Sequence, residues 1–267
     1  MNLKIFEYGQ VGQPTLLFLH GLGVSSWMWQ EQVEALQDRY HVLAVDLPGN
    51  GESYRAEWVS FAATAVTLAH IIRDRATNGQ AHVVGLSLGG YTALTLLANH
   101  PERVLSTLVS GVTIRPFPDN FAYKLMPKLM SRAMGWGLTI ALMSRVMQLP
   151  PEAQPLYRRD SKNLSRETIL RTYDEVLTFS LPAALVEQRP RLLAVAGAKE
   201  AQLVLDSLPD FHTVDTAVTA VIPSAHHGWN GEFPELFTEM VENWVEERPL
   251  PSALQQTTAK TAPPVLA

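Results

Sequence analysis

A serine occupies the pattern Gly85-x-Ser87-x-Gly89, between a run of apolar residues and a segment with helical spacing. A hydroxyl on a sharp turn from strand to helix is exposed for attack on a carbonyl, and its neighbours must be small because strand and helix approach closely there. The start of the following helix also offers unpaired backbone N–H groups that favour developing negative charge. We therefore predict that Ser87 is a nucleophile.

A serine hydroxyl is a weak nucleophile at neutral pH unless a histidine accepts its proton and a carboxylate fixes the tautomer of that histidine. In open parallel sheets such residues lie at the carboxyl ends of strands. Two of the eight histidines, His226 and His227, directly follow a predicted strand over 218–222. Adjacent side chains near a strand end point in different directions, so we expect only one of the two to reach the serine.

Strand and helix patterns alternate along most of the chain. Apolar runs predict strands over 15–19, 42–45, 82–86, 105–110, 192–197 and 218–222, and residues with helical spacing lie between them. Parallel neighbours need crossover connections, so this alternation predicts an α/β fold with a mostly parallel central sheet and helices on both faces.

The alternation is interrupted at 112–185, where prolines separate short helical stretches. We interpret this segment as a helical lid, inserted after the sixth strand of a core formed by 1–111 and 186–248. Residues 249–267 are rich in Pro, Thr, Ala and Gln without periodicity, which predicts a disordered tail.

The amino-acid composition argues against several kinds of cofactor, metal site and partner. The absence of cysteine excludes disulfides, thiol catalysis and cysteine metal sites, and no Gly-rich dinucleotide motif, phosphate loop or metal-ligand cluster is present, so we expect no cofactor and no metal. A net charge of −5 argues against nucleic acid or an anionic membrane as partner, and no apolar run is long enough to span a bilayer. The N-terminus shows no secretory signal, so we expect a cytoplasmic protein. The sequence does not indicate the oligomeric state.

Four ordered motifs together resemble the α/β-hydrolase family, and they span 15–247. They are His20-Gly21, Asp46-x-Pro48-Gly49-x-Gly51-x-Ser53, Gly85-x-Ser87-x-Gly89-Gly90 and His227-x-Trp229-Asn230-x-Glu232-x-Pro234. The resemblance implies that His227 is the catalytic base and that His226, at a position usually occupied by glycine, is structural. It also implies that His20 and Asp46 organise loops.

The same resemblance implies an acid and an oxyanion hole. The family usually has Gly-x-x-Asp after the penultimate strand, where this chain has Gly197-Ala198-Lys199-Glu200. We favour Glu200 as the acid over Asp206 and Asp215. The backbone N–H groups of Leu22 and Leu88 are the expected oxyanion donors.

The predicted lid carries five of the eight methionines and ten Lys and Arg against six Asp and Glu. Methionine stripes on helices usually pack in a core, but stripes that faced Ser87 would form an adaptable apolar pocket. We predict pocket positions at Trp27, Met126, Met130 and Trp229. The net charge of +4 on the lid would favour an anionic substrate or a thioester on an acidic carrier, unless it is simply a solvated face.

The resulting hypothesis is a serine carboxylesterase acting on a small-molecule ester, of small to medium size and largely apolar, through an acyl-enzyme. Hydrolysis of a lactone, thioester or C–C bond, or perhydrolysis, uses the same triad. Serine at 87 argues against the epoxide hydrolases and haloalkane dehalogenases that resemble this scaffold. A ligand receptor or regulator built on the hydrolase fold is an alternative of a different class.

Overall fold

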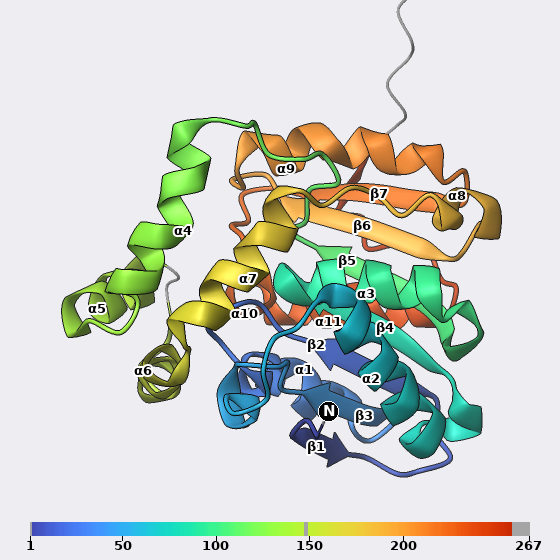
Figure 1. The fold of residues 1–267 in the computed structure, drawn as a ribbon. Helices are drawn as coiled ribbons and strands as arrows, with labels where there is room; N and C mark the ends of the chain where they lie inside the picture. Colours follow the sequence, from blue (N-terminus) through green and yellow to red (C-terminus); the bar gives the residue numbers. More distant parts are fainter. Residues whose placement is uncertain (1, 147–148, 258–267) are drawn as a thin grey trace, which may run out of the picture.

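The computed structural model describes residues 2–146 and 149–257, and its strands form one sheet in the order β1-β3-β2-β4-β5-β6-β7-β8 (Figure 1). All neighbours pair in parallel except β1 with β3 and β7 with β8. The predicted mostly parallel sheet is confirmed. The strands are β1 Ile5–Tyr8, β2 Thr15–Leu19, β3 His41–Val45, β4 Ala81–Leu86, β5 Val104–Ser110, β6 Leu192–Gly197, β7 Ala217–Ile222 and β8 Gln255–Gln256.

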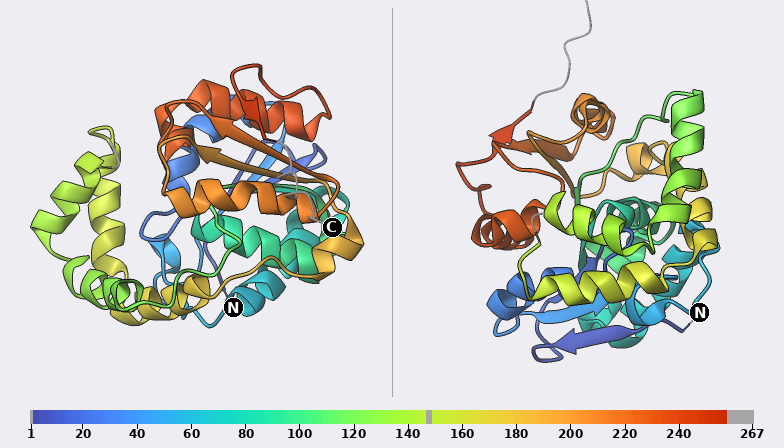
Figure 2. Two further views of the ribbon diagram at one scale, coloured as in Figure 1. Left: turned by 90° about the horizontal axis from the view of Figure 1, so that it is seen from above. Right: turned by 90° about the vertical axis from the view of Figure 1, so that its left-hand side faces the viewer.

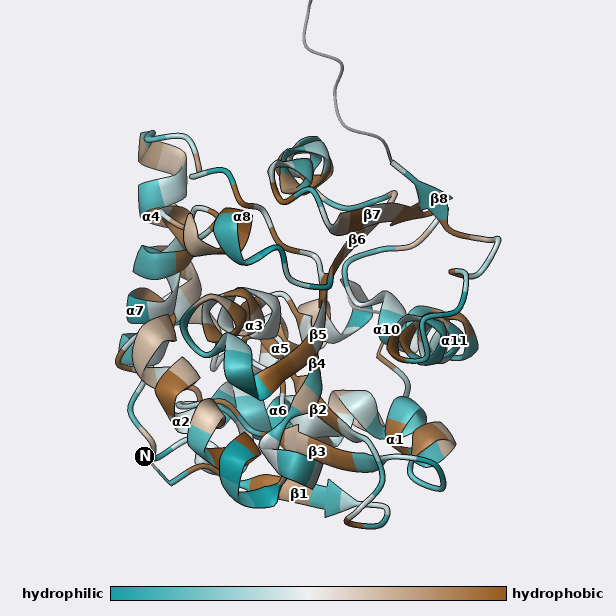
Figure 3. Ribbon diagram, turned by 90° about the vertical axis from the view of Figure 1, so that its right-hand side faces the viewer, coloured by the Kyte–Doolittle hydropathy of each residue, from teal (hydrophilic) through white to brown (hydrophobic). Residues whose placement is uncertain are grey.

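Helices cover both faces of the sheet, as expected (Figure 3). On one face lie α2 (Phe61–Arg75), α3 (Leu88–Asn99) and α8 (Ala184–Gln188), and on the other lie α1 (Gln30–Leu36) and α11 (Pro234–Val245). Strands β2, β3, β4 and β6 are buried along their whole length, which explains why they read as uninterrupted apolar runs. A separate apolar core lies on each face of the sheet.

The helical insertion follows β5, the fifth strand, and not the sixth strand as we predicted. It contains α4 (Phe121–Ala133), α5 (Gly137–Val146), α6 (Ala153–Asn163) and α7 (Arg166–Leu177), which lie together on one side of the sheet (Figures 1 and 2). The chain then returns to the core, where Leu185 of α8 is fully buried. Two short helices, α9 (Gln202–Ser207) and α10 (Trp229–Glu232), follow β6 and β7.

The expectation of a structureless tail over 249–267 is wrong for its first part. Leu254 is buried, and β8 pairs antiparallel with β7, with Gln255 opposite Val221. Residues 258–267 lie outside the described part of the chain.

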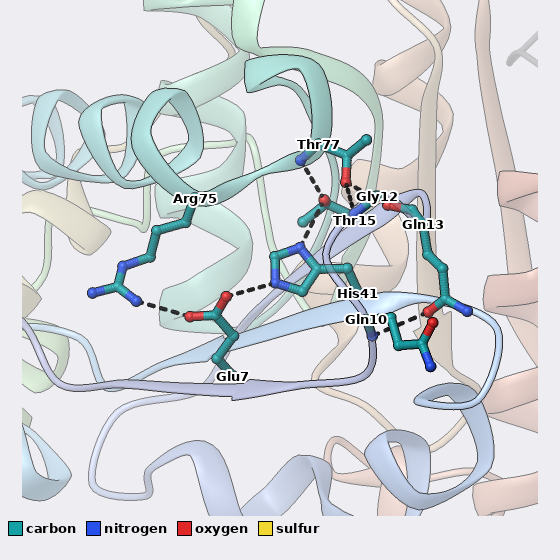
Figure 4. A network of polar contacts seen from close by, with 8 residues as sticks. All are labelled: Glu7, Gln10, Gly12, Gln13, Thr15, His41, Arg75 and Thr77. Carbon is teal, nitrogen blue, oxygen red and sulfur yellow. Dashed lines mark hydrogen bonds and ion pairs between the residues drawn. The ribbon is translucent and has the colours of Figure 1, made fainter.

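At the amino ends of β2 and β3 a polar network joins β1, β2, β3 and α2 (Figure 4). The buried His41 ring lies between Thr15 Oγ1 at 3.1 Å and Glu7 Oε1 at 2.8 Å, and Glu7 also accepts from Arg75 at 2.8 Å. Burial raises the pKa of Glu7, but its bonds with His41 and Arg75 outweigh this and lower it. The network fixes these ends of β1, β2 and β3. A site is therefore expected at the opposite edge of the sheet, at the carboxyl ends of the parallel strands.

Candidate active site

Ser87 lies on a strained turn between β4 and α3. Its φ of 55° and ψ of −117° are rare for a residue with a side chain, and its N–H donates to Ser110 O at 2.8 Å. The glycines are required for packing, because a Cβ on Gly85 would lie 2.3 Å from Gly89 O, and one on Gly89 would lie 2.0 Å from Leu19 O. This is the expected elbow, with the serine half-exposed at the carboxyl end of β4.

His227 and Glu200 come together from two neighbouring loops. Nδ1 of His227 lies 2.6 Å from Glu200 Oε2, and the glutamate side chain is only 2% exposed while about half of the histidine side chain is accessible. The other carboxylate oxygen accepts from Gly197 N–H at 3.4 Å. Since an ionised carboxylate only accepts, Nδ1 carries the proton and Nε2 is left as an acceptor.

Parallel register explains why these loops meet. Gly197, the last residue of β6, is opposite Ile222, the last residue of β7, so the segments after both strands start at the same level. Backbone bonds then join the segments, from Ala198 N–H to Ile222 O and from Lys199 N–H to Ala225 O, both at 2.9 Å. The sheet therefore brings the segment that carries Glu200 beside the segment that carries His227.

Gly111, directly after β5, lies beside the histidine. With φ of 68°, a Cβ at this position would approach His227 Cε1 to 2.6 Å and Glu200 Oε1 to 3.2 Å. Its neighbour Ser110 accepts from Ser87 N–H, so this short segment contacts both halves of the site. Among the described residues no hydrogen bond joins Ser87 Oγ to His227. In free enzymes such bonds are often long and tighten only with substrate.

Two opposing effects act on the pKa of His227. Desolvation lowers it, whereas the hydrogen bond with Glu200 and the charge of that carboxylate raise it, and the net direction is upward. A raised pKa makes the imidazole a stronger base, which suits a group that must take a hydroxyl proton.

The neighbouring His226 has a partner of its own. Its backbone N–H donates to Glu232 Oε2 at 2.8 Å and its Nδ1 lies 3.0 Å from Glu232 Oε1. Burial raises the pKa of Glu232, but the bonds with His226 outweigh this and lower it. The two adjacent histidines therefore bind different glutamates.

His20 organises the loop opposite the elbow. The buried ring donates from Nδ1 to Gly21 O at 2.6 Å and accepts Leu47 N–H at Nε2 at 2.9 Å, which defines a neutral tautomer. Desolvation lowers its pKa, in agreement with the neutral form. A Cβ on Gly21 would lie 3.6 Å from Ser87 Cβ, so the loop lies directly against the nucleophile.

The two expected oxyanion donors belong to segments that contact the serine. Leu88 is the first residue of α3, where the N–H has no intrahelical acceptor, and Leu22 follows Gly21 in the His20 loop. Within the described residues neither N–H has a recorded acceptor. The N–H of Leu88 lies at the positive end of the α3 dipole, where a developing negative charge is favoured.

Comparison with known proteins shows which family and fold this chain resembles. The α/β hydrolase fold family matches residues 14–138, from β2 through the elbow to the start of α5. The chain is 26% identical to an AB hydrolase superfamily protein of Gibberella zeae, over 91% of this chain and 84% of that one. The solved structure of an enol-lactonase from Burkholderia xenovorans has the same fold, with a TM-score of 0.75 at 19% identity, covering 91% of this chain and 96% of the other. The chain therefore has the α/β-hydrolase fold, and its residues 14–138 match the family of that name.

A further relative carries a more specific name. The chain is 32% identical to a pimeloyl-[acyl-carrier protein] methyl ester esterase of Vibrio campbellii, over 64% of this chain and 65% of that protein. The match thus leaves about a third of each chain outside it.

Asp46, from the core, holds the segment of residues 23–27 that follows the His20 loop. This buried carboxylate accepts two backbone N–H groups, from Ser26 at 2.8 Å and from Glu52 at 2.7 Å. Asn50 Oδ1 also accepts Gly23 N–H at 3.0 Å. The aspartate motif therefore positions a loop, in the way the family resemblance implied.

Asp160 of α6, in the insertion, also holds this segment. The sequence alone did not indicate a role for this residue. Its side chain is 1% exposed, and Oδ2 accepts from Ser25 Oγ and from Trp27 Nε1, both at 2.7 Å. Arg159 pairs with the other oxygen at 2.8 Å. Nothing in the local sequence pattern distinguishes this carboxylate from the others of the insertion.

The predicted pocket residues do not share one place. Trp229 lies in the core and does not line a pocket, because its ring is fully buried 4.6 Å from Phe237 and its Nε1 donates to Ser110 Oγ at 2.9 Å. Trp27 is half-buried, and its Nε1 is bound to Asp160. In α4, Met126 is partly exposed.

Met134, the residue directly after α4, reaches the loop that follows His20. A Cβ on Gly23 would lie 2.7 Å from Met134 Cε and 3.7 Å from Leu164 Cδ2, so these insertion residues lie over the loop. Met130, one turn earlier, contacts Tyr173 Oη through its sulfur at 3.4 Å. In the sequence, the four-residue spacing of Met126, Met130 and Met134 indicates one stripe of a helix. Met134 is the member of this stripe that lies beside Gly23.

Two classes of site find no support in the described residues. No group of three or more His, Asp or Glu side chains there is arranged to hold a metal ion. No helix within that part of the chain is both long and apolar enough to cross a bilayer.

Proposed function

We propose that this α/β hydrolase cleaves carboxylic esters of small to medium size and largely apolar character, by a Ser87-His227-Glu200 triad. The observation that carries the proposal is the 2.6 Å contact of His227 Nδ1 with the buried Glu200, beside a serine on a strained elbow. The esterase name of the Vibrio campbellii relative supports the same class of substrate.

In the proposed reaction Ser87 Oγ attacks the ester carbonyl while His227 Nε2 takes its proton. The N–H groups of Leu22 and Leu88 stabilise the resulting oxyanion, and each such donor typically contributes about 10²–10³-fold in rate. His227 then returns the proton to the leaving alcohol, and the acyl group stays on the serine. A water molecule deprotonated by the same histidine attacks the acyl-enzyme and releases the acid.

Glu200 has a supporting role in this scheme. It keeps the Nδ1–H tautomer and stabilises the imidazolium that forms when the serine proton is taken. Because its side chain is almost fully buried, its charge acts on the histidine with little screening by water.

A lactone is the second candidate substrate, because the fold is shared with a solved enol-lactonase. A lactone is a cyclic ester, so the same attack and the same oxyanion apply. The difference is that the leaving alcohol stays attached to the acyl group.

The test is hydrolysis of p-nitrophenyl acetate, butyrate and octanoate over many turnovers, by the wild type and by Ser87→Ala. Ser180→Ala, at an exposed position between α7 and α8, is the matched control. We expect turnover that Ser87→Ala loses by at least about 10³-fold and that Ser180→Ala retains. A wild type no faster than Ser87→Ala on all three esters and on a simple lactone would contradict the proposal. Slow single turnover coupled to a partner protein would favour the receptor alternative.

A further inference from the structure

Helices α4 and α5 lie at the outer edge of the molecule, away from the sheet (Figure 2). The two helices and the turn between them carry large apolar side chains that are exposed to solvent. Leu138 is 83% exposed, Phe121 76% and Trp136 67%, and Leu129 and Leu142 are more than half exposed. We call these five residues the outer surface of the insertion. Most other large apolar side chains of this protein are buried, so their concentration on two consecutive helices calls for a partner.

In α5 the exposed residues face away from the catalytic side. Ile140 is buried and packs with Val24 beside the oxyanion loop, and Met143 packs against the same cluster. Leu138 and Leu142, four residues apart, lie on one stripe of the helix, opposite that buried side. They therefore do not line a path to Ser87.

Helix α4 shows the same division. Met130, on its inner side, contacts Tyr173, and Met134, directly after the helix, lies beside Gly23 in the loop that follows His20. Leu129 lies about 100° around the helix from Met130, and Phe121 is eight residues before Leu129 on the exposed side. One side of the insertion therefore faces the candidate site. The opposite side, which carries the outer surface, faces away from that site.

Charge indicates what that partner is. From Asn120 to Val146 the sequence contains no Asp or Glu, but it contains Lys124, Lys128, Arg132 and Arg145, all exposed. Lys124 pairs with Asp119. For the other three cations no ion pair is recorded within the described residues, whereas many arginines of the core are paired with carboxylates.

We propose that the outer surface of the insertion binds an anionic lipid surface, with α4 and α5 lying in the plane of the headgroups. Exposed Trp, Phe and Leu interleaved with unpaired cations on short helices match what such an interface requires, and tryptophan is favoured at headgroup depth. The net charge of −5 conceals this local excess of positive charge, which is why it argued against such a partner. The inference goes beyond the proposed function and does not depend on it.

The experiment is flotation with vesicles of phosphatidylcholine alone and of an equimolar mixture with phosphatidylglycerol, without any ester substrate. We expect binding to the anionic vesicles that weakens as salt is raised, and little binding to phosphatidylcholine alone. Trp136 is the one strongly exposed tryptophan of the six, so its fluorescence should shift to the blue on binding. Trp136→Phe should bind but lose the shift.

Two double variants identify the surface. Lys128→Glu with Arg132→Glu should lower the partition coefficient at least about tenfold, since each cation near an anionic surface contributes about that order. Leu138→Ser with Leu142→Ser should lower it as well. The matched controls outside the insertion are Arg55→Glu and Val59→Ser, both at exposed positions, and they should bind like the wild type.

Absence of binding to the anionic vesicles, or binding that both double variants retain, would overturn the proposal. So would sedimentation velocity that shows a dimer abolished by the Leu138→Ser and Leu142→Ser pair, because the surface would then be covered by a second copy. Hydrolysis of p-nitrophenyl acetate should be unchanged in every variant, which keeps the outcome separate from that of the catalytic proposal.

Discussion

The segment from Gly23 to Trp27 is held by one buried carboxylate from the core and one from the insertion, and the two hold it differently. Asp46 accepts only backbone N–H groups, whereas Asp160 accepts only side-chain donors. Bonds to the backbone depend on the path of the chain and hardly on residue type. Bonds to side chains depend on residue identity, and they can be released without changing that path.

This contrast extends through the two regions. In the core, the elbow, the tautomer of His20 and the meeting of Glu200 with His227 all depend on backbone geometry. In the insertion, Met134 and Asp160 reach the site through side chains. We infer that the core determines the chemistry and that the insertion adjusts access and selectivity, and the following predictions test this division.

The largest effect is expected in the core. Glu200→Gln should lower kcat about 10³-fold or more, because the neutral amide no longer stabilises the imidazolium or fixes its tautomer. Glu232→Gln, which changes the partner of the adjacent His226, is the control and should retain activity within about threefold. Steady-state kinetics on p-nitrophenyl butyrate distinguish them, and equal losses would show that both glutamates serve the site.

The next effect concerns Gly111. Gly111→Ala should lower kcat by about 10²-fold, because the new Cβ displaces the His227 ring and small displacements have large kinetic costs. Its positive φ should also lower the free energy of unfolding by about 1 kcal/mol. Gly135→Ala in the insertion, where no atom lies within 4 Å of the new Cβ, should change neither quantity. If the two variants behave alike, backbone geometry in the core is not what limits the site.

The two aspartates allow a direct comparison of the regions. Asp46→Asn should lower the free energy of unfolding by about 1–3 kcal/mol, because an amide oxygen cannot satisfy both buried N–H groups as the carboxylate does. Asp160→Asn should leave the main unfolding transition nearly unchanged and lower kcat/KM about tenfold by loosening the insertion. Thermal unfolding and kinetics on the three esters measure both. The division of roles fails if Asp160→Asn unfolds as readily as Asp46→Asn.

The smallest effect is a displacement of the pH profile. Since the pKa of His227 is raised in the folded protein, kcat/KM should rise with pH with a midpoint above the ordinary histidine value of about 6.5. The folded state favours the protonated ring, so this contribution to stability is present at low pH and is lost as pH rises through the raised pKa. Glu200→Gln should move the midpoint downward, because desolvation then acts unopposed. Asp160→Asn should not move this midpoint. A shifted midpoint in that variant would show that the insertion affects the pKa of His227.

The sequence was sufficient for the sheet and for the loops at its carboxyl ends, because strand periodicity and parallel pairing together determine which loops are neighbours. That reasoning placed Ser87 and the pair His226 and His227 at this edge of the sheet, whereas the resemblance to the α/β-hydrolase family selected His227 and Glu200. Neither of them found Asp160, which contacts residues 25 and 27 over separations of 135 and 133 residues, since no local pattern encodes how an insertion folds back. Trp229 was misplaced for a related reason: an aromatic residue beside a catalytic motif can face the core as well as the site.

Strand β8 determines which edge of the sheet a C-terminal truncation would expose. Together with β1 it ends the sheet on an antiparallel strand at each side, and its two residues occupy part of the hydrogen-bonding edge of β7. An open edge strand is a template on which other chains can pair. A version shortened at Leu250 would leave β7 uncovered and also lose the buried Leu254. Its expected failure is therefore edge-to-edge aggregation of a protein that still has its whole catalytic apparatus.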